Sequence, residues 1–165
     1  EQLSPAKLVL ALNKIAGENG IGRIDVMEDR MLGLKVRENY ECPASTVLLK
    51  AHGAIEALVL TRDELRFKKL VDQEWSKLAY EGLWYDPFKT DLEAFINKTQ
   101  ERLTGDVKLF KGAVTVVGRS SQWALYNEDL ASFDTTTFDQ RESTGSVKMF
   151  GLQARMFLAL QQKLK

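Results

Sequence analysis

Apolar and polar side chains alternate in two neighbouring runs early in the chain, and alternation is typical of β-strands. The first run covers Arg23–Glu28 and the second covers Met31–Val36, with Asp29-Arg30 between them. Because successive side chains of a strand point to opposite faces, one face of the first run carries Ile24, Val26 and Glu28. The pattern predicts a hairpin with a carboxylate on an otherwise apolar face.

A second pair of β-rich runs covers Val107–Phe110 and Ala113–Val117. Lys111-Gly112 joins these runs, and such a short connection is typical of a tight turn. We therefore predict a second antiparallel hairpin later in the chain.

Apolar residues at helical spacing predict two helices that flank the first hairpin. The first helix begins at Ser4-Pro5, and Gly17 and Gly20 end it. The second begins at Pro43 and runs to Leu58.

Two further helices follow, and each has its own start and stop signals. Thr61, with Glu64 three residues later, predicts a capping box, and Gly82 ends that helix. Asp86-Pro87 begins the next helix, and Gly105 closes it. The inner face of the capped helix is expected to carry Phe67, Leu70, Val71, Trp75 and Leu78.

The last helix is expected from Ser146 to Leu164, and its apolar residues form two stripes. A helix that docks on one core needs a single stripe. The second stripe therefore predicts a further buried contact, such as one with another subunit.

The order of elements defines the fold class. Hairpins pair their strands antiparallel, so the class is α+β. The predicted architecture is an antiparallel sheet, built from two or more hairpins and packed with helices, plus an extended C-terminal helix.

Composition narrows the classes of function. The 23 basic and 23 acidic residues balance, which argues against a nucleic-acid binder. The one cysteine cannot form an internal disulfide, which fits a reducing compartment such as the cytoplasm. One cysteine and one histidine cannot make a metal cluster, although a carboxylate-bound magnesium stays open. No apolar run approaches the roughly 20 residues of a membrane span, and the missing initiator methionine suggests a processed or truncated chain.

Few residues suggest chemistry on their own. Gly20-Ile21-Gly22 lacks the third glycine and the preceding strand of a dinucleotide loop. Glu28 needs a partner or a ligand on its apolar face, and spacing alone favours a salt bridge or exposure at the turn. Tyr40 precedes a proline-led helix, where its phenol either points into a cleft or stays half-buried with its hydroxyl in water. His52 and Cys42 are interpreted as structural, because no catalytic partner is positioned beside them.

The Glu28 side chain has two candidate salt-bridge partners nearby in sequence, Arg30 and Arg37. Acidic pairs such as Asp25 with Glu28 usually lie solvated at the ends of elements. Sequence spacing alone does not decide between these alternatives for Glu28.

Several motifs nevertheless resemble one family over nearly the whole chain. They include Leu12-Asn13-Lys14-Ile15-Ala16-Gly17-Glu18-Asn19-Gly20-Ile21-Gly22-Arg23-Ile24-Asp25, Glu28-Asp29-Arg30, Tyr40-Glu41-Cys42-Pro43, Tyr80-Glu81-Gly82-Leu83-Trp84 and Leu125-Tyr126-Asn127-Glu128-Asp129-Leu130. The chain resembles the C-terminal synthetase and multimerisation domain of the argininosuccinate synthase family.

The resemblance implies an ATP-dependent ligase. The complete enzyme joins citrulline to aspartate in arginine synthesis, with ATP and magnesium, and releases AMP and pyrophosphate. Its ATP and aspartate contacts lie in an N-terminal nucleotide-binding domain with a Ser-Gly-Gly loop, which this sequence lacks. The fragment is therefore expected to bind no cofactor and to be inactive alone, with that domain, citrulline and further copies in a homotetramer as partners.

Two citrulline contacts of the family map onto this chain. Glu28 matches the glutamate of the Glu-Asn-Arg motif, and Tyr40 matches the tyrosine of Tyr-Glu-Thr-Pro. Both are binding residues, and no catalytic, cofactor-binding or metal-binding residue is assigned. The chain departs from the family at Glu38, where glycine is usual, at Cys42, which replaces threonine, and at Asp29, which replaces asparagine.

The resemblance also suggests a division of labour. Residues 1–143 are expected to form the synthetase-type citrulline-binding domain, and residues 144–165 an oligomerisation helix. The alternative is a non-catalytic module that serves assembly or binds a small molecule. No nucleic acid or membrane partner is expected.

Overall fold

A computed structural model describes residues 2–110, 114–131 and 139–164. The chain divides into two compact units, Glu1–Leu125 and Tyr126–Lys165. The first unit contains α1 (Pro5–Glu18), β1 (Arg23–Asp29), β2 (Lys35–Glu41), α2 (Pro43–Val59), α3 (Arg62–Tyr80), α4 (Pro87–Gln100), β3 (Asp106–Phe110) and β4 (Thr115–Ser120). The second contains α5 (Glu128–Ala131), a 3₁₀ turn (Gln140–Glu142), α6 (Ser143–Phe150) and α7 (Leu152–Lys163).

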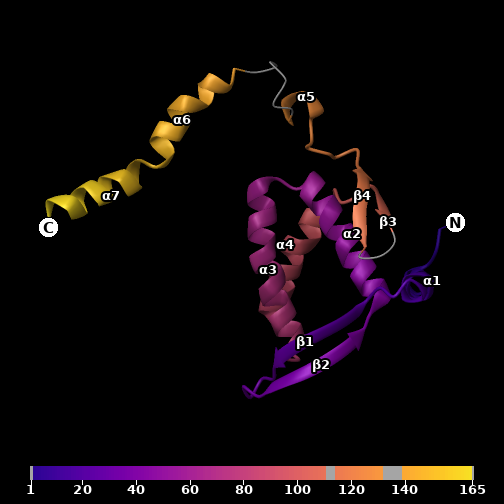
Figure 1. The fold of residues 1–165 in the computed structure, drawn as a ribbon. Coiled ribbons are helices and arrows are strands. Elements are labelled where there is room, and N and C mark those ends of the chain that lie inside the picture. Colours follow the sequence, from indigo (N-terminus) through magenta and orange to yellow (C-terminus); the bar gives the residue numbers. More distant parts are fainter. Residues whose placement is uncertain (1, 111–113, 132–138, 165) are drawn as a thin grey trace. The chain divides into compact units, whose positions relative to one another are not determined.

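The first unit is built around α2 (Figure 1). α2 packs on α1 and on the β3–β4 hairpin, and α3 packs on α4. The apolar side chains buried in this unit are Ala16, Ala44, Ala54, Ile55, Val59, Leu60, Val71, Leu78 and Val114. Helices packed with two antiparallel hairpins confirm the predicted α+β class.

The first hairpin forms as predicted, but its second strand lies further along the chain. β2 covers Lys35–Glu41, not Met31–Val36. Arg30 and Leu34 close the turn, with Arg30 N donating to Leu34 O at 2.8 Å. Gly33 within it has a φ of +79°, a conformation that glycine adopts without steric cost. The apolar residues before β2 that had suggested a strand lie in this longer turn. As a result, Tyr40 lies inside β2 rather than beyond the second strand.

The register of this hairpin determines which side chains share a face. Glu28 lies opposite Val36, Val26 opposite Glu38, and Ile24 opposite Tyr40. Because strands alternate, these six side chains line one face, as the sequence predicts for the β1 residues.

The second hairpin is also confirmed, with shifted bounds. β3 pairs with β4 antiparallel, and the register shifts between Lys108 and Leu109. β4 covers Thr115–Ser120, so it starts and ends later than the predicted run. The predicted turn at Lys111-Gly112 lies outside the described residues.

Both helices after α2 begin where the sequence predicts, but α4 ends early. The capping box of α3 is present in both directions between Thr61 and Glu64. α4 ends at Gln100, five positions before Gly105. Gly105 instead lies at the entrance to β3, where a Cβ atom would clash with the Ser120 carbonyl oxygen. The close approach of two strands, rather than a helix stop, explains that glycine.

The inner face of α3 differs from the prediction at three positions. Val71 and Leu78 are buried, but Phe67 and Leu70 are about half exposed, at 49% and 53%. Lys68 is buried in their place, at 4% exposure. It lies three residues before Val71, so it shares the buried face of the helix.

The second unit carries two short helices where one long helix was expected. α6 ends at Phe150 and α7 begins at Leu152, with Gly151 between them. Glycine is a poor residue for a helix interior, which accounts for the break. Within this unit both predicted apolar stripes are exposed, for example Val147 at 68%, Met149 at 66% and Phe157 at 60%.

Candidate functional site

The β1–β2 hairpin brings the two sequence-predicted site residues together. Tyr40 Oη donates a hydrogen bond to Glu28 Oε1 at 2.6 Å. The two residues lie 12 positions apart in sequence, and the register of the hairpin places them on the same face. Their proximity therefore depends on the pairing of the strands.

Arg30 joins this pair from the turn. Its Nη2 donates to Glu38 Oε1, and its Nη1 lies 3.6 Å from Glu28 Oε2. The Tyr80 phenol, at the end of α3, also interacts with the guanidinium and raises its pKa. We call these five residues the hairpin cluster: Glu28, Arg30, Glu38, Tyr40 and Tyr80.

The structure distinguishes between the two salt-bridge partners that spacing suggested for Glu28. Arg30 does contact Glu28, as a simple salt bridge would require. Arg37 instead pairs with Asp25 on the opposite face, with Nη2 and Oδ2 2.6 Å apart. Asp25 and Glu28 therefore face apart and do not form a carboxylate pair.

Hydrogen bonds and neighbouring charges set the protonation states of Tyr40 and Arg30. The hydrogen bond to Glu28 raises the pKa of Tyr40, and burial and the negative charges of Glu28 and Glu38 act in the same direction. The hydrogen bond with Tyr80 raises the pKa of Arg30, against a smaller effect of burial, and both carboxylates add to the rise. At neutral pH the Tyr40 phenol is therefore protonated, and the guanidinium is charged.

The cluster has the chemistry of a binding site. A carboxylate accepts hydrogen bonds only, and a phenol can donate or accept. The side chain of Glu28 is 24% exposed and that of Glu38 is 34% exposed, so a ligand can reach them. The pocket between α2 and β4 and the pocket between α2, α3 and α4 are lined by other residues.

Sequence spacing named Arg30 as a candidate partner of Glu28, and that contact is present, but it did not point to Glu38 or Tyr80 as members of this cluster. Glu38 would have been found from alternation alone, because it is in phase with Val36 and Tyr40 on β2. The predicted strand ended at Val36, so it stopped short of Glu38. Tyr80 comes from another element, so only the tertiary structure brings it here.

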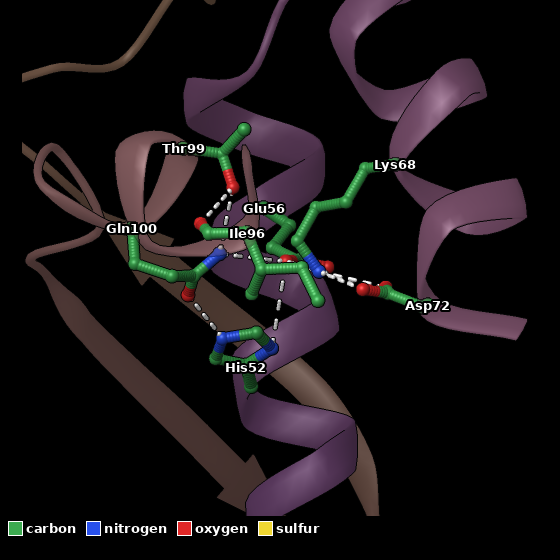
Figure 2. Close-up of polar contacts among 7 residues, drawn as sticks. All are labelled: His52, Glu56, Lys68, Asp72, Ile96, Thr99 and Gln100. Carbon is green, nitrogen blue, oxygen red and sulfur yellow. Dashed lines mark hydrogen bonds and ion pairs between the residues drawn. The ribbon is translucent and has the colours of Figure 1, made fainter. Parts of the chain in front are cut away.

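A second polar group, which we call the helix cluster, joins α2, α3 and α4 (Figure 2). Lys68 Nζ lies 2.9 Å from Glu56 Oε1 and 2.7 Å from Asp72 Oδ2. His52 Nε2 is 2.6 Å from Gln100 Oε1, and Gln100 Nε2 donates to Glu56 Oε1 at 3.3 Å. The Lys68–Asp72 pair lies within α3, and the other contacts cross from one helix to another.

The buried lysine keeps its charge through these partners. Burial lowers the pKa of Lys68, but hydrogen bonds with Asp72 and Glu56 outweigh it and raise the pKa overall. His52 serves the same network, in line with the structural role expected of it. The polar groups of the helix cluster thus find their hydrogen-bond and ion-pair partners within the cluster.

Cys42 is a half-buried free thiol, as the sequence suggested. Its Sγ lies 3.7 Å from the Gly22 carbonyl oxygen and 3.9 Å from Thr46 Oγ1. Neither neighbour is a base that could activate a nucleophile. In residues 2–110, 114–131 and 139–164, no group of three or more His, Cys, Asp or Glu side chains could hold a metal ion. None of the helices that the structure describes has the length and apolar character needed to cross a bilayer.

The fold and the hairpin cluster define an α+β domain whose first hairpin carries a partly exposed, partly anionic face. The family model described as "Arginosuccinate synthase C-terminal domain" matches residues 1–157. The chain is also 59% identical to the argininosuccinate synthase of Methanosarcina acetivorans over 165 residues, which are 99% of this chain and 42% of that protein.

Other relatives agree. The argininosuccinate synthase of Methanocaldococcus jannaschii is 57% identical over 159 residues, 95% of this chain and 40% of that protein. That of Archaeoglobus fulgidus is 54% identical over 164 residues, 98% of this chain and 42% of that protein. The chain belongs to the argininosuccinate synthase C-terminal domain family, and it spans about two fifths of the length of these relatives.

Proposed function

We propose that this chain forms the C-terminal part of an argininosuccinate synthase. The whole enzyme would join L-citrulline to L-aspartate with ATP and give argininosuccinate, AMP and pyrophosphate. The observation that carries the proposal is the hydrogen bond between Tyr40 and Glu28, the two residues that match citrulline contacts in the family. The family match over residues 1–157 supports the same reaction.

Each member of this pair suits one part of an amino-acid ligand. The Glu28 carboxylate can bind an ammonium through charge-assisted hydrogen bonds, which are stronger than neutral ones. The Tyr40 phenol can serve either end of the zwitterion, because it both donates and accepts. We assign binding to both residues and catalysis to neither.

The chemistry of the reaction would belong to the whole enzyme. A ureido oxygen is a poor leaving group until it carries a phosphoryl ester, so citrulline would first be adenylated by ATP. The aspartate amine would then displace AMP. We assign ATP, its magnesium and aspartate to an N-terminal nucleotide-binding domain, since this sequence has no phosphate-binding glycine loop. On this proposal the chain alone is inactive, binds no cofactor and works in the cytoplasm.

The exposed apolar residues of α6 and α7 support a second role, in assembly. Phe150 of α6 is 93% exposed and Met156 of α7 is 63% exposed within the chain. Contiguous exposed apolar surface is unfavourable in water and marks interaction sites. We propose that residues 144–165 make oligomer contacts, in a homotetramer as the family resemblance implies, and that residues 1–143 carry the citrulline half-site.

A hybrid protein tests the ligase proposal. The N-terminal part of the Methanosarcina acetivorans relative is joined to this chain in place of the segment that it matches. We expect AMP release that requires both citrulline and aspartate, and none from this chain alone. A folded hybrid that binds ATP but releases no AMP under these conditions would contradict the proposal.

Sedimentation tests the assembly role. The 18.7 kDa chain is expected to self-associate as its concentration rises, because association buries the apolar side chains of α6 and α7. A variant that ends at Gly145 should stay monomeric over the same range. A strictly monomeric full chain, unchanged by the truncation, would count against the assembly role.

A further inference from the structure

Arg30 contacts the two carboxylates of the hairpin cluster unequally. Its Nη2 makes a hydrogen bond to Glu38 Oε1. Its Nη1 lies 3.6 Å from Glu28 Oε2, which is too long for a hydrogen bond. The interaction with the Tyr80 phenol raises the pKa of the guanidinium. Arg30 is therefore hydrogen-bonded to Glu38, while its ion pair with Glu28 is longer and has no hydrogen bond.

The β-hairpin explains why both acids can reach one guanidinium. Glu28 lies opposite Val36, and Glu38 lies two residues beyond Val36 on the same face of β2. Arg30 follows β1 directly and enters the turn, so its long side chain can fold back along that face. A guanidinium has five N–H donors, enough for several partners at once.

The side chains of the hairpin cluster carry an unbalanced negative charge, which one cation would neutralise. Two carboxylates and one guanidinium carry one net negative charge, and the phenols of Tyr40 and Tyr80 add none. An amino-acid ammonium would balance that charge. Glu28 has the oxygen for it, because Tyr40 occupies only Oε1 with a hydrogen bond and Oε2 has none from Arg30.

Without Glu38 the same arginine would become a competitor. A free guanidinium pairs with a carboxylate through two parallel hydrogen bonds, a strong geometry for such a pair. Arg30 is already beside Glu28, so a small rotation would complete that pair. The Glu28 charge would then be neutralised from within the protein.

We propose that Glu38 is a positioning residue: it keeps Arg30 from closing its 3.6 Å ion pair with Glu28 into a hydrogen-bonded pair, and so keeps the Glu28 carboxylate available for the ammonium of an amino-acid ligand. The inference rests on the proposed function, in which Glu28 binds citrulline. It adds that the affinity of this half-site depends on a residue that does not itself touch the ligand.

The hybrid protein tests this with citrulline as the varied substrate. Glu38→Gln is expected to raise the KM for citrulline about 3- to 10-fold, the size of a partly exposed charge interaction, with kcat retained. In the double variant Arg30→Gln with Glu38→Gln the competitor is gone. The KM should then return to within about 2-fold of the starting value, because the lost carboxylate is no longer needed.

A matched control is available on the other face of the hairpin. Asp25→Asn also removes one carboxylate from this hairpin, where it pairs with Arg37, and it should leave the KM for citrulline unchanged. The Tyr40 phenol gives a readout without turnover. In Glu38→Gln its titration, taken as the difference from Tyr40→Phe, should move to lower pH, because Arg30 lowers the pKa of Tyr40 and Glu38 raises it.

The outcomes separate the two proposals. If Glu28→Gln weakens citrulline binding but Glu38→Gln does not, the positioning role of Glu38 is overturned and the proposed function stands. A double variant as impaired as Glu38→Gln would also overturn it, since the loss would not act through Arg30. If Glu28→Gln has no effect on the KM for citrulline, the site assignment fails and the inference fails with it.

Discussion

Replacing Glu28 with glutamine should raise the KM of the hybrid protein for citrulline about 10- to 100-fold, because a hydrogen bond to a charged group contributes about 1.5–3 kcal/mol. The amide keeps an oxygen that can accept from Tyr40, so the hairpin should stay folded. What disappears is the negative charge that would hold the ligand ammonium. Because that contact is expected in both the ground state and the transition state, kcat should change little.

Steady-state kinetics with each substrate varied in turn measure this effect. The KM values for aspartate and ATP should stay within about 2-fold, since those ligands are assigned to another domain. Asp29→Asn is the matched control, because Asp29 is the next residue of β1, points to the other face and pairs with Lys35 at 2.8 Å. Equal effects of the two substitutions would argue that Glu28 acts only on the fold.

Replacing Lys68 with methionine should destabilise the first unit by about 3 kcal/mol, because removing one partner of a buried ion pair leaves the other charge uncompensated. The Lys68 side chain is 5% exposed and that of Glu56 is 11% exposed. Urea unfolding followed by circular dichroism measures the change.

Two comparison variants test the reason for that loss. Lys98→Met removes an exposed lysine that pairs with Glu101 at 2.7 Å, and it should cost less than about 1 kcal/mol. Adding Glu56→Leu to Lys68→Met removes the stranded carboxylate and should restore much of the stability. A loss in Lys68→Met no larger than that in Lys98→Met would show that the buried pair contributes little.

The same pair gives the stability a pH dependence. The pKa of Lys68 in the folded chain is raised above its ordinary value of 10.5, so the folded state holds this proton more tightly than the unfolded chain. The contribution is complete below pH 10.5 and is lost as the pH rises through the folded value. The difference between the parent chain and Lys68→Met should therefore narrow in strongly alkaline solution.

Local signals in the sequence located most of the elements. The capping box at Thr61 and the prolines at the starts of α1, α2 and α4 fix helix starts through local geometry, so they could be read directly. The end of β1 was also accessible, because alternation stops there. The extent of the turn was not, since Met31–Val36 alternates as a strand would while Gly33 closes a turn.

The site was harder to predict, for two physical reasons. The contact between Glu28 and Tyr40 depends on the register of β1 and β2, and register follows from the turn that was placed wrongly. The family resemblance supplied both residues, while spacing alone left Glu28 with several partners. Lys68 was missed because lysine is rarely buried, and only its carboxylate partners make that burial tolerable.

The end of α3 has a consequence for how this domain tolerates changes in chain length. Tyr80, the last residue of α3, interacts with Arg30 and raises its pKa, while Lys68, twelve residues earlier on the same helix, pairs with Glu56. Removing one residue between these points would turn Tyr80 by about 100° and shift it by about 1.5 Å. The length of α3 therefore determines where Tyr80 meets Arg30, which lies on another element. The exposed positions of α3 between Lys68 and Tyr80 should tolerate substitution but not the removal of a residue.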